Sequence, residues 1–217
     1  MFKIQSSDII NGRIDHIEPQ ESISCVDLEE LVELPNWSEL TMVIIVGCPN
    51  LKCLPSWPNV TDLMCVKCEN VETLGEWSNI KRLHIGVCPN VKFIPNYKSL
   101  ITANVLYLDN VTELPNWPNV TFVCCSHCTN LVSLPNWNKV EHVRCGGCKK
   151  IEFLPNWENI KFVDCQDCNE LNVYPTWVNK VNVFTQNCPI LLYESMCAMF
   201  QTDFFIKDLE HEIFDWC

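Results

Sequence analysis

Cysteines are the residues of this sequence with the most obvious capacity for chemistry. The 217-residue chain contains sixteen of them. Four pairs have the Cys-x-x-Cys spacing, namely Cys65/Cys68, Cys125/Cys128, Cys145/Cys148 and Cys165/Cys168. Sixteen residues separate the second pair from the third, which satisfies the spacing of a zinc ribbon with four cysteine ligands. A structural zinc site is therefore one interpretation of these cysteines.

A cysteine nucleophile is a second interpretation. Cys124 and His142 occur at similar places in two successive segments of the chain, and a thiol beside an imidazole can act as a nucleophile. The sequence shows no third orienting group and no oxyanion pocket, however, and it contains no glycine-rich phosphate loop, because Gly146-Gly147 lies in a repeat turn. We therefore predict that the chain is not an enzyme and has no catalytic residues.

These cysteines belong to a repeat of twenty residues. A Leu-Pro-Asn-Trp corner recurs without insertion or deletion, and its eight copies start at Leu34, Leu54, Leu74, Ile94, Leu114, Leu134, Leu154 and Tyr174. Counted from the first residue of this corner, apolar residues recur at positions 1, 7, 10, 12 and 18, and cysteine recurs at position 15. A fixed period in this range is typical of a repeat solenoid.

The repeat predicts the structure of each coil. Apolar residues at positions 10 and 12 alternate with variable ones, which indicates a short strand. Proline at position 2 and asparagine at position 3 oppose helix and favour turns or extended backbone. We therefore expect a strand, a turn and an extended return in each coil, with about nine parallel strands on the concave face and little helix before residue 188.

Written out, the pattern is L-x-x-L-x-L-x-x-C-x-x-L-x-x-L-P, which resembles the leucine-rich-repeat signature. The chain is similar to the short twenty-residue arrays of bacterial type III effectors and of large DNA viruses, over roughly residues 22–193. The resemblance implies an α/β repeat solenoid, a horseshoe of parallel β-strands with extended, non-helical returns. Such effectors often carry a ubiquitin-ligase domain after the repeats, and no segment here is long enough for one. Departures from the family are cysteine in place of asparagine at position 15 and an aromatic residue at position 4.

We predict three segments along the chain. Residues 1–33 form an N-terminal β cap with a degenerate first repeat, residues 34–193 form eight repeats, and residues 194–217 form a C-terminal helical cap. Asn11-Gly12 between apolar residues predicts a β-hairpin, and the apolar residues after Cys188 follow helical spacing. Residues 1–13 lack a long apolar run, which predicts neither a signal peptide nor a membrane span.

The repeat changes the interpretation of the cysteines. Position 12 holds Ile45, Ile85 and Val105 in other copies, and position 15 holds Leu28 and Leu108. A position that accepts these residues is apolar, and a buried thiol behaves there as a small hydrophobe. We also expect the thiol at position 15 to donate to carbonyls of the neighbouring coil. Core cysteines are therefore preferred over zinc or disulfides, and we predict no cofactor and no metal ligands. Reduced thiols favour a cytoplasmic location, and a virion is an alternative.

The aromatic residue at position 4 predicts a ladder. Its members are Trp37, Trp57, Trp77, Tyr97, Trp117, Trp137, Trp157 and Trp177. Stacked coils bring such rings close enough to pack offset and to seal the return side of the solenoid. An exposed aromatic stripe that binds a glycan or an extended peptide is the alternative.

Charge excludes some classes of partner. The net charge is −12, and it is concentrated in residues 1–33 and 194–217. An acidic chain with a nearly neutral array argues against nucleic acid and against anionic membranes as partners.

Positions 9, 11 and 13 of the strands point outward and vary, so we predict that the chain binds a protein or peptide there. Aromatic residues and arginine on one face are typical of interface anchors. The predicted partner-binding residues are Met42, Ile44, Met64, Arg82, His84, Asn104, Phe122, His142, Arg144, Phe162, Asp164 and Phe184. We further expect a lateral pair between Arg144 and Asp164 that holds Arg144 between Phe122 and Phe162.

This function would suit a pathogen or viral protein that acts on host proteins. The alternatives are a structural or assembly component of a larger particle such as a virion, with self-association through the early apolar patch, and, less favoured, a zinc-binding protein.

Overall fold

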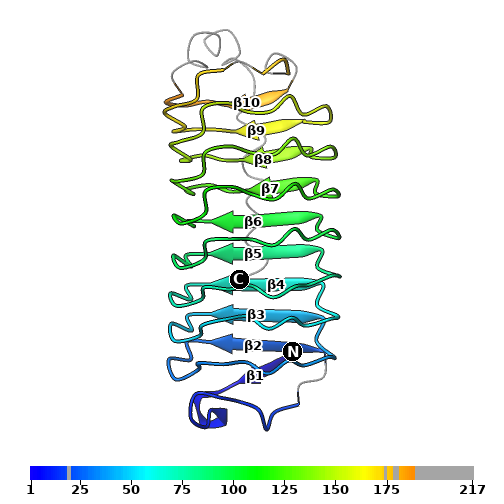
Figure 1. Cartoon of the computed structure of the whole chain (residues 1–217), viewed down its shortest axis with the longest axis vertical. Coiled ribbons are helices and arrows are strands. Elements are labelled where there is room, and N and C mark those ends of the chain that lie inside the picture. The colour runs from blue at the N-terminus through cyan, green and yellow to red at the C-terminus, as the bar shows by residue number, and fades with distance from the viewer. Residues whose placement is uncertain (19–20, 174, 178–180, 189–217) are drawn as a thin grey trace.

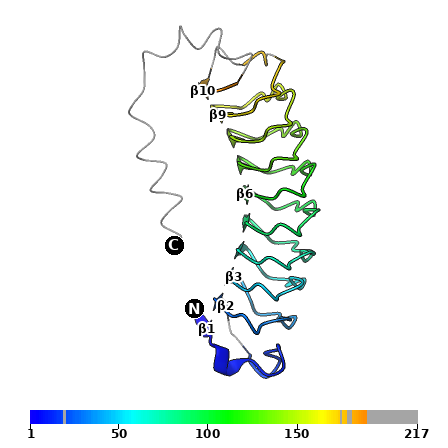
Figure 2. The ribbon, with the colours of Figure 1, turned by 90° about the vertical axis from the view of Figure 1, so that its left-hand side faces the viewer.

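The structure, a computed structural model, describes residues 1–18, 21–173, 175–177 and 181–188. Within these residues the chain winds into a solenoid, and its ten strands form one sheet in the order of the sequence (Figure 1). All neighbouring strands are parallel. The strands lie on the concave side of the arc and the returns on its convex side (Figure 2).

The strands are short, as the repeat predicts. Five have five residues: β2 (Ser22–Val26), β3 (Met42–Val46), β4 (Asp62–Val66), β5 (Arg82–Gly86) and β6 (Thr102–Leu106). Five have three residues: β1 (Phe2–Ile4), β7 (Phe122–Cys124), β8 (His142–Arg144), β9 (Phe162–Asp164) and β10 (Asn182–Phe184). In the described part of the chain, the 3-10 turn η1 (Ser6–Asp8) is the only helical element. The predicted solenoid of parallel strands with extended returns is therefore confirmed, whereas the predicted helical cap lies outside the described residues.

The sequence did not predict strand β1, which brings the number of strands to ten. Ile4 is buried and pairs with Cys25 of β2, so β1 extends the sheet by one strand at its N-terminal end. Three residues are too few to show an alternating pattern, and this is why the strand was missed. The hairpin at Asn11-Gly12 is present, with both residues at positive φ and two hydrogen bonds between Ile10 and Arg13.

Equivalent residues of successive coils lie side by side. Strands pair with an offset of one repeat, so that Met42 lies beside Asp62 and Asp62 lies beside Arg82. Positions 10 and 12 point into the core, where Val43 and Ile45 are completely buried. Because side chains alternate along a strand, positions 9, 11 and 13 face outward on the concave side.

Each strand of the repeat is followed by a residue in the left-handed region at position 14. Its φ lies between +52° and +75° in all nine coils, at Asp27, Gly47, Lys67, Val87, Tyr107, His127, Gly147, Asp167 and Asn187. This conformation turns the chain out of the strand and into the return. Only Gly47 and Gly147 adopt it without steric cost, and Val87 is the least suited of these residues because it is β-branched.

The cysteines at positions 12 and 15 are core residues. Their thiols are free, and those at both positions are completely buried. Six of the seven thiols at position 15 donate to the position-12 carbonyl of the preceding coil, as from Cys148 Sγ to Cys125 O at 3.0 Å and from Cys168 Sγ to Cys145 O at 3.2 Å. Cys68 Sγ instead contacts Val66 O at 3.4 Å. The predicted contact with the neighbouring coil is therefore confirmed.

The aromatic residues at position 4 form a buried ladder. All of them except the half-buried Trp37 are at most 5% exposed. Five of the neighbouring pairs stack, with ring centroids 5.3 to 6.4 Å apart. Every indole from Trp57 onward also donates to the carbonyl of a position-2 proline one coil earlier, as from Trp137 Nε1 to Pro115 O at 3.0 Å, whereas Trp37 Nε1 donates to Ile17 O at 2.8 Å. Tyr97 makes the same bond to Gly75 O at 2.9 Å. The ladder therefore holds the return side together, and its burial rules out the alternative of an exposed binding stripe.

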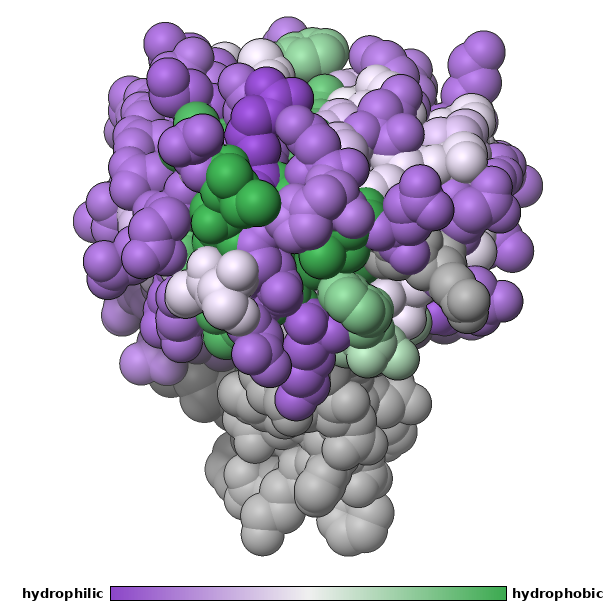
Figure 3. All heavy atoms as spheres, turned by 90° about the horizontal axis from the view of Figure 1, so that it is seen from below, coloured by the Kyte–Doolittle hydropathy of each residue, from purple (hydrophilic) through white to green (hydrophobic). Residues whose placement is uncertain are grey.

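The N-terminal end of the solenoid is mostly polar. Figure 3 shows this end, with a small number of apolar residues among hydrophilic ones. Phe2 and Ile10 are among the exposed apolar residues. Such an end suits a terminal coil, which has to contact water. Within the described residues, no helix has both the length and the apolar character needed to cross a membrane.

Candidate functional site

The predicted partner-binding residues all lie on the concave face, at positions 9 and 11 of strands β3 to β10. Most are half-buried, whereas Arg82 is exposed. Side chains at these positions are half-buried because their lateral neighbours cover them on two sides, whereas the side towards the concavity is open.

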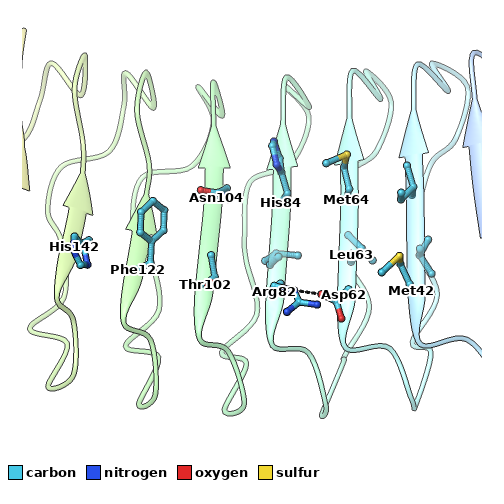
Figure 4. Close-up of a pocket in the computed structure, with 13 residues that line it drawn as sticks. Met42, Asp62, Leu63, Met64, Arg82, His84, Thr102, Asn104, Phe122 and His142 are labelled. Carbon is cyan, nitrogen blue, oxygen red and sulfur yellow. Dashed lines mark hydrogen bonds and ion pairs between the residues drawn. The ribbon is translucent and has the colours of Figure 1, made fainter. Parts of the chain in front are cut away.

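A hollow of about 310 Å³ lies on this face along strands β3 to β8. Eight of the predicted residues line it, namely Met42, Ile44, Met64, Arg82, His84, Asn104, Phe122 and His142. Figure 4 shows these side chains projecting from β3, β4, β5, β6, β7 and β8. The other four predicted residues, Arg144, Phe162, Asp164 and Phe184, lie beyond the hollow on β8, β9 and β10.

Asp62 is a residue of the hollow that the sequence did not indicate. It forms an ion pair with Arg82, its neighbour in the next coil (Figure 4). Asp62 also accepts a hydrogen bond from Thr61 Oγ1 at 2.7 Å. The side chain of Asp62 is 10% exposed, against 54% for Arg82. The signal was available in the sequence, because opposite charges stand at position 9 of two successive repeats.

His84 lies at the centre of the hollow. Its lateral neighbours are Met64 on β4 and Asn104 on β6. Burial lowers the pKa of His84, because the charged form of the ring loses water. The imidazole is therefore neutral at pH 7, and the floor of the hollow combines apolar surface with neutral hydrogen-bonding groups.

Four rings form a continuous series along the C-terminal part of the face, here called the aromatic row: Phe122, His142, Phe162 and Phe184. Successive centroids are 6.3, 6.3 and 5.4 Å apart, and the rings are tilted against one another. Burial lowers the pKa of His142, so this ring is neutral at pH 7 and packs as an aromatic group. The structure thus brings together rings that are 20 to 22 residues apart in the sequence.

The predicted pair between Arg144 and Asp164 is wrong. The residues are lateral neighbours, but within the described part of the chain no ion pair of 4.0 Å or less joins them. Asp164 Oδ1 instead accepts a hydrogen bond from the backbone N–H of Gln166 at 3.2 Å. The guanidinium of Arg144 lies over the ring of Phe162, with Cζ 5.7 Å from the centroid. A local backbone donor and an aromatic face therefore replace the expected ion pair.

The arrangement of Cys124 and His142 does not activate a thiol. Cys124 is 7% exposed, and its Sγ contacts Ser126 Oγ at 3.6 Å. Its lateral neighbour is Arg144, whereas His142 lies beside Phe122. Burial raises the pKa of Cys124, which keeps the sulfur protonated.

The eight cysteines of the Cys-x-x-Cys pairs all lie in the core, where they are completely buried. Among the residues that the structure describes, no three His, Cys, Asp or Glu side chains are arranged to hold a metal ion.

The chain was compared with protein-family models, curated proteins and solved structures. No protein-family model matches the chain, and no curated protein matches it either. Among solved structures, the leucine-rich repeat domain of the type III effector XopL matches with a TM-score of 0.65 at 16% sequence identity. The match covers 79% of this chain and 70% of that one. The chain has the leucine-rich-repeat fold. At this identity the likeness shows the fold alone, and it agrees with the resemblance noted in the repeat pattern.

The leucine-rich-repeat fold directs attention to the concave face. Solenoids stack their coils with a small rotation per repeat, which creates an extended concave surface. In this chain that surface carries both the hollow and the aromatic row.

Proposed function

We propose that the chain is a non-catalytic interaction module that binds a protein or peptide on its concave sheet. The observation that supports this most directly is the aromatic row beside the apolar wall of the hollow, on the outward side of the strands. The tryptophan rings of the return side, by contrast, are buried in the core from Trp57 onward. Aromatic residues, methionine and arginine are also the residue types enriched at protein interfaces.

The distribution of polar groups also supports a protein partner. Neutral imidazoles at His84 and His142 and the amide of Asn104 offer hydrogen bonds without adding charge. Apolar contact area with a few directional polar groups is what a specific protein interface requires. A role on host proteins and a place in a virion stay predictions.

A pair of phenylalanines on opposite sides of the solenoid, in adjacent repeats, allows a matched test. Phe162 belongs to the aromatic row, whereas Phe153 is 45% exposed at position 20 of the repeat, in the return. Partners are captured from an extract of the source organism with the wild-type chain, and the affinity of each identified partner is measured for the variants. We expect Phe162→Ala and Arg144→Glu each to weaken binding by about 1–4 kcal/mol, as interface anchors do.

Phe153→Ala should leave the affinity unchanged. Equal affinity for the wild-type chain, Phe162→Ala and Arg144→Glu, or a loss only with Phe153→Ala, would place the binding surface on the return side and overturn the proposal. Sedimentation velocity of the wild-type chain distinguishes the assembly alternative, which requires a concentration-dependent larger species.

A further inference from the structure

Arg144 is a cation on the concave face that lacks a carboxylate partner. Two other cations near this face are paired, Arg82 with Asp62 and Lys161 with Glu141 at 2.7 Å. For Arg144 no described carboxylate lies within 4.0 Å, and its guanidinium rests on Phe162. A guanidinium on an aromatic face keeps its N–H donors available in a fixed plane, which suits a carboxylate bound through two hydrogen bonds.

The hollow is suited to a different group. Met42, Ile44 and Met64 form its apolar wall, and Phe122 and His142 close it at the end nearer to Arg144. A volume of about 310 Å³ is large enough for one large apolar side chain. Methionine side chains adapt to the shape of such a group because they are unbranched and flexible.

Resting on the proposed function, we propose that the partner segment is an extended acidic peptide that crosses the strands along the axis of the solenoid. It places a large apolar side chain in the hollow, near His84 on β5, and a carboxylate against Arg144 on β8.

The spacing of these two groups follows from the sheet. Three strand intervals at about 4.8 Å separate β5 from β8, a distance of about 14 Å, which an extended chain covers in about four residues. Side chains four residues apart in an extended peptide point to the same side. The carboxylate therefore faces Arg144 when the apolar group faces the hollow.

Asp164, the lateral neighbour of Arg144, does not occupy the guanidinium donors. Its Oδ1 accepts a hydrogen bond from the Gln166 N–H, and no ion pair of 4.0 Å or less joins it to Arg144. An incoming carboxylate gains the guanidinium donors without displacing an existing ion pair.

The test is selection from a displayed library of random peptides of about twelve residues, which span about 40 Å when extended. The full chain serves as the target. We expect enriched peptides to share a large apolar residue and an Asp or Glu about four positions away. A synthetic peptide of that consensus should lose about tenfold or more in affinity with Arg144→Gln, as expected for a charge-assisted hydrogen-bonded pair.

Two further variants make the result specific. Met64→Ser removes part of the apolar wall and should also weaken the peptide, whereas Lys149→Gln, in the exposed turn after β8, should not. Circular dichroism must show that each variant keeps the fold.

Failure of this inference is distinguishable from failure of the proposed function. The acidic-peptide inference is wrong if the enriched peptides share no acidic residue. It is also wrong if their affinity is unchanged by Arg144→Gln but lost with Phe162→Ala. In both cases the proposed binding site on the concave face is retained. Peptides that no concave variant affects overturn both. If no peptide is enriched, the extended-peptide inference is wrong, and the capture experiment with Phe162→Ala and Phe153→Ala alone decides the proposed function.

Discussion

Asp62 and Arg82 occupy the same position in adjacent coils, and their side chains form an ion pair between β4 and β5. The pair is asymmetric, because the Asp62 side chain is 10% exposed and the Arg82 side chain 54%. Loss of the ion pair should therefore cost more at the buried Asp62 carboxylate than at the exposed Arg82 guanidinium.

Removal of Arg82 should consequently destabilise the fold. Arg82→Ala leaves a largely buried carboxylate without its ionic partner, and we expect the free energy of unfolding to fall by about 1–3 kcal/mol. Urea denaturation measures this change. The double variant with Asp62→Asn should recover part of the loss, and equal stability of Arg82→Ala and wild type would show that the pair contributes nothing.

Val87 is expected to be a site of backbone strain. Its φ is +52°, which costs a β-branched residue about 1–2 kcal/mol, and its side chain is exposed. Val87→Asn should therefore raise the free energy of unfolding by about 1 kcal/mol, since asparagine tolerates this conformation and Asn187 already occupies the equivalent position. The thermal melting point is the measurement. Val46→Asn, in a strand, should have the opposite effect, and a lower melting point for Val87→Asn would contradict the assignment of strain.

Tyr97 allows the contribution of the ladder's hydrogen bonds to be measured separately from that of ring packing. Its hydroxyl donates to Gly75 O at 2.9 Å, and the ring is 2% exposed. Tyr97→Phe keeps the ring and removes the donor, so we expect a loss of about 1–2 kcal/mol in the free energy of unfolding. Denaturant titration tests this, with Tyr107→Phe at an exposed turn as a control that should have no effect. A neutral Tyr97→Phe would mean that water satisfies the Gly75 carbonyl.

Buried thiols should make the fold sensitive to alkali. Burial raises the pKa of Cys25 and of Cys128 from 9.0 to about 12. Their contribution to stability is complete below the unfolded value of 9.0 and is lost as pH rises from there to about 12, because the unfolded chain releases these protons first. Each such thiol contributes about 1.4 kcal/mol per pH unit in that window.

Stability measured by denaturation at several pH values should therefore fall steeply above pH 9. Cys128→Leu is the matched control, since leucine occupies position 15 at Leu108. This variant should release one proton fewer on unfolding, which makes the fall in the free energy of unfolding with pH less steep. A flat profile from pH 9 to 11 would contradict the burial of the thiols in neutral form.

Chelators should not affect the folded protein. The thiols at position 15 bond to backbone carbonyls of the preceding coil, so their role requires no metal. We expect the melting temperature to be unchanged by a zinc chelator, and nearly all sixteen thiols to react under denaturing, reducing conditions. Zinc at one ion per chain after purification would restore the zinc interpretation.

The sequence by itself determined the coil. Its fixed period, the alternation at positions 10 and 12, and the exchange of Cys128 with Leu108 specify which side chains face the core, because burial selects for apolar character wherever it recurs. The outward positions follow from the same alternation, so all twelve predicted partner-binding residues lie on one face.

Only the tertiary structure decided how those outward residues meet. The hollow is formed by side chains of six successive strands, β3 to β8, and the lateral pairing of Asp62 with Arg82 depends on the geometry of two side chains rather than on their types. The same charges at Arg144 and Asp164 do not pair, because Asp164 accepts a nearby backbone N–H and Arg144 finds an aromatic face. A repeat pattern fixes the backbone position of each residue, whereas the choice between competing partners depends on local distances and rotamers.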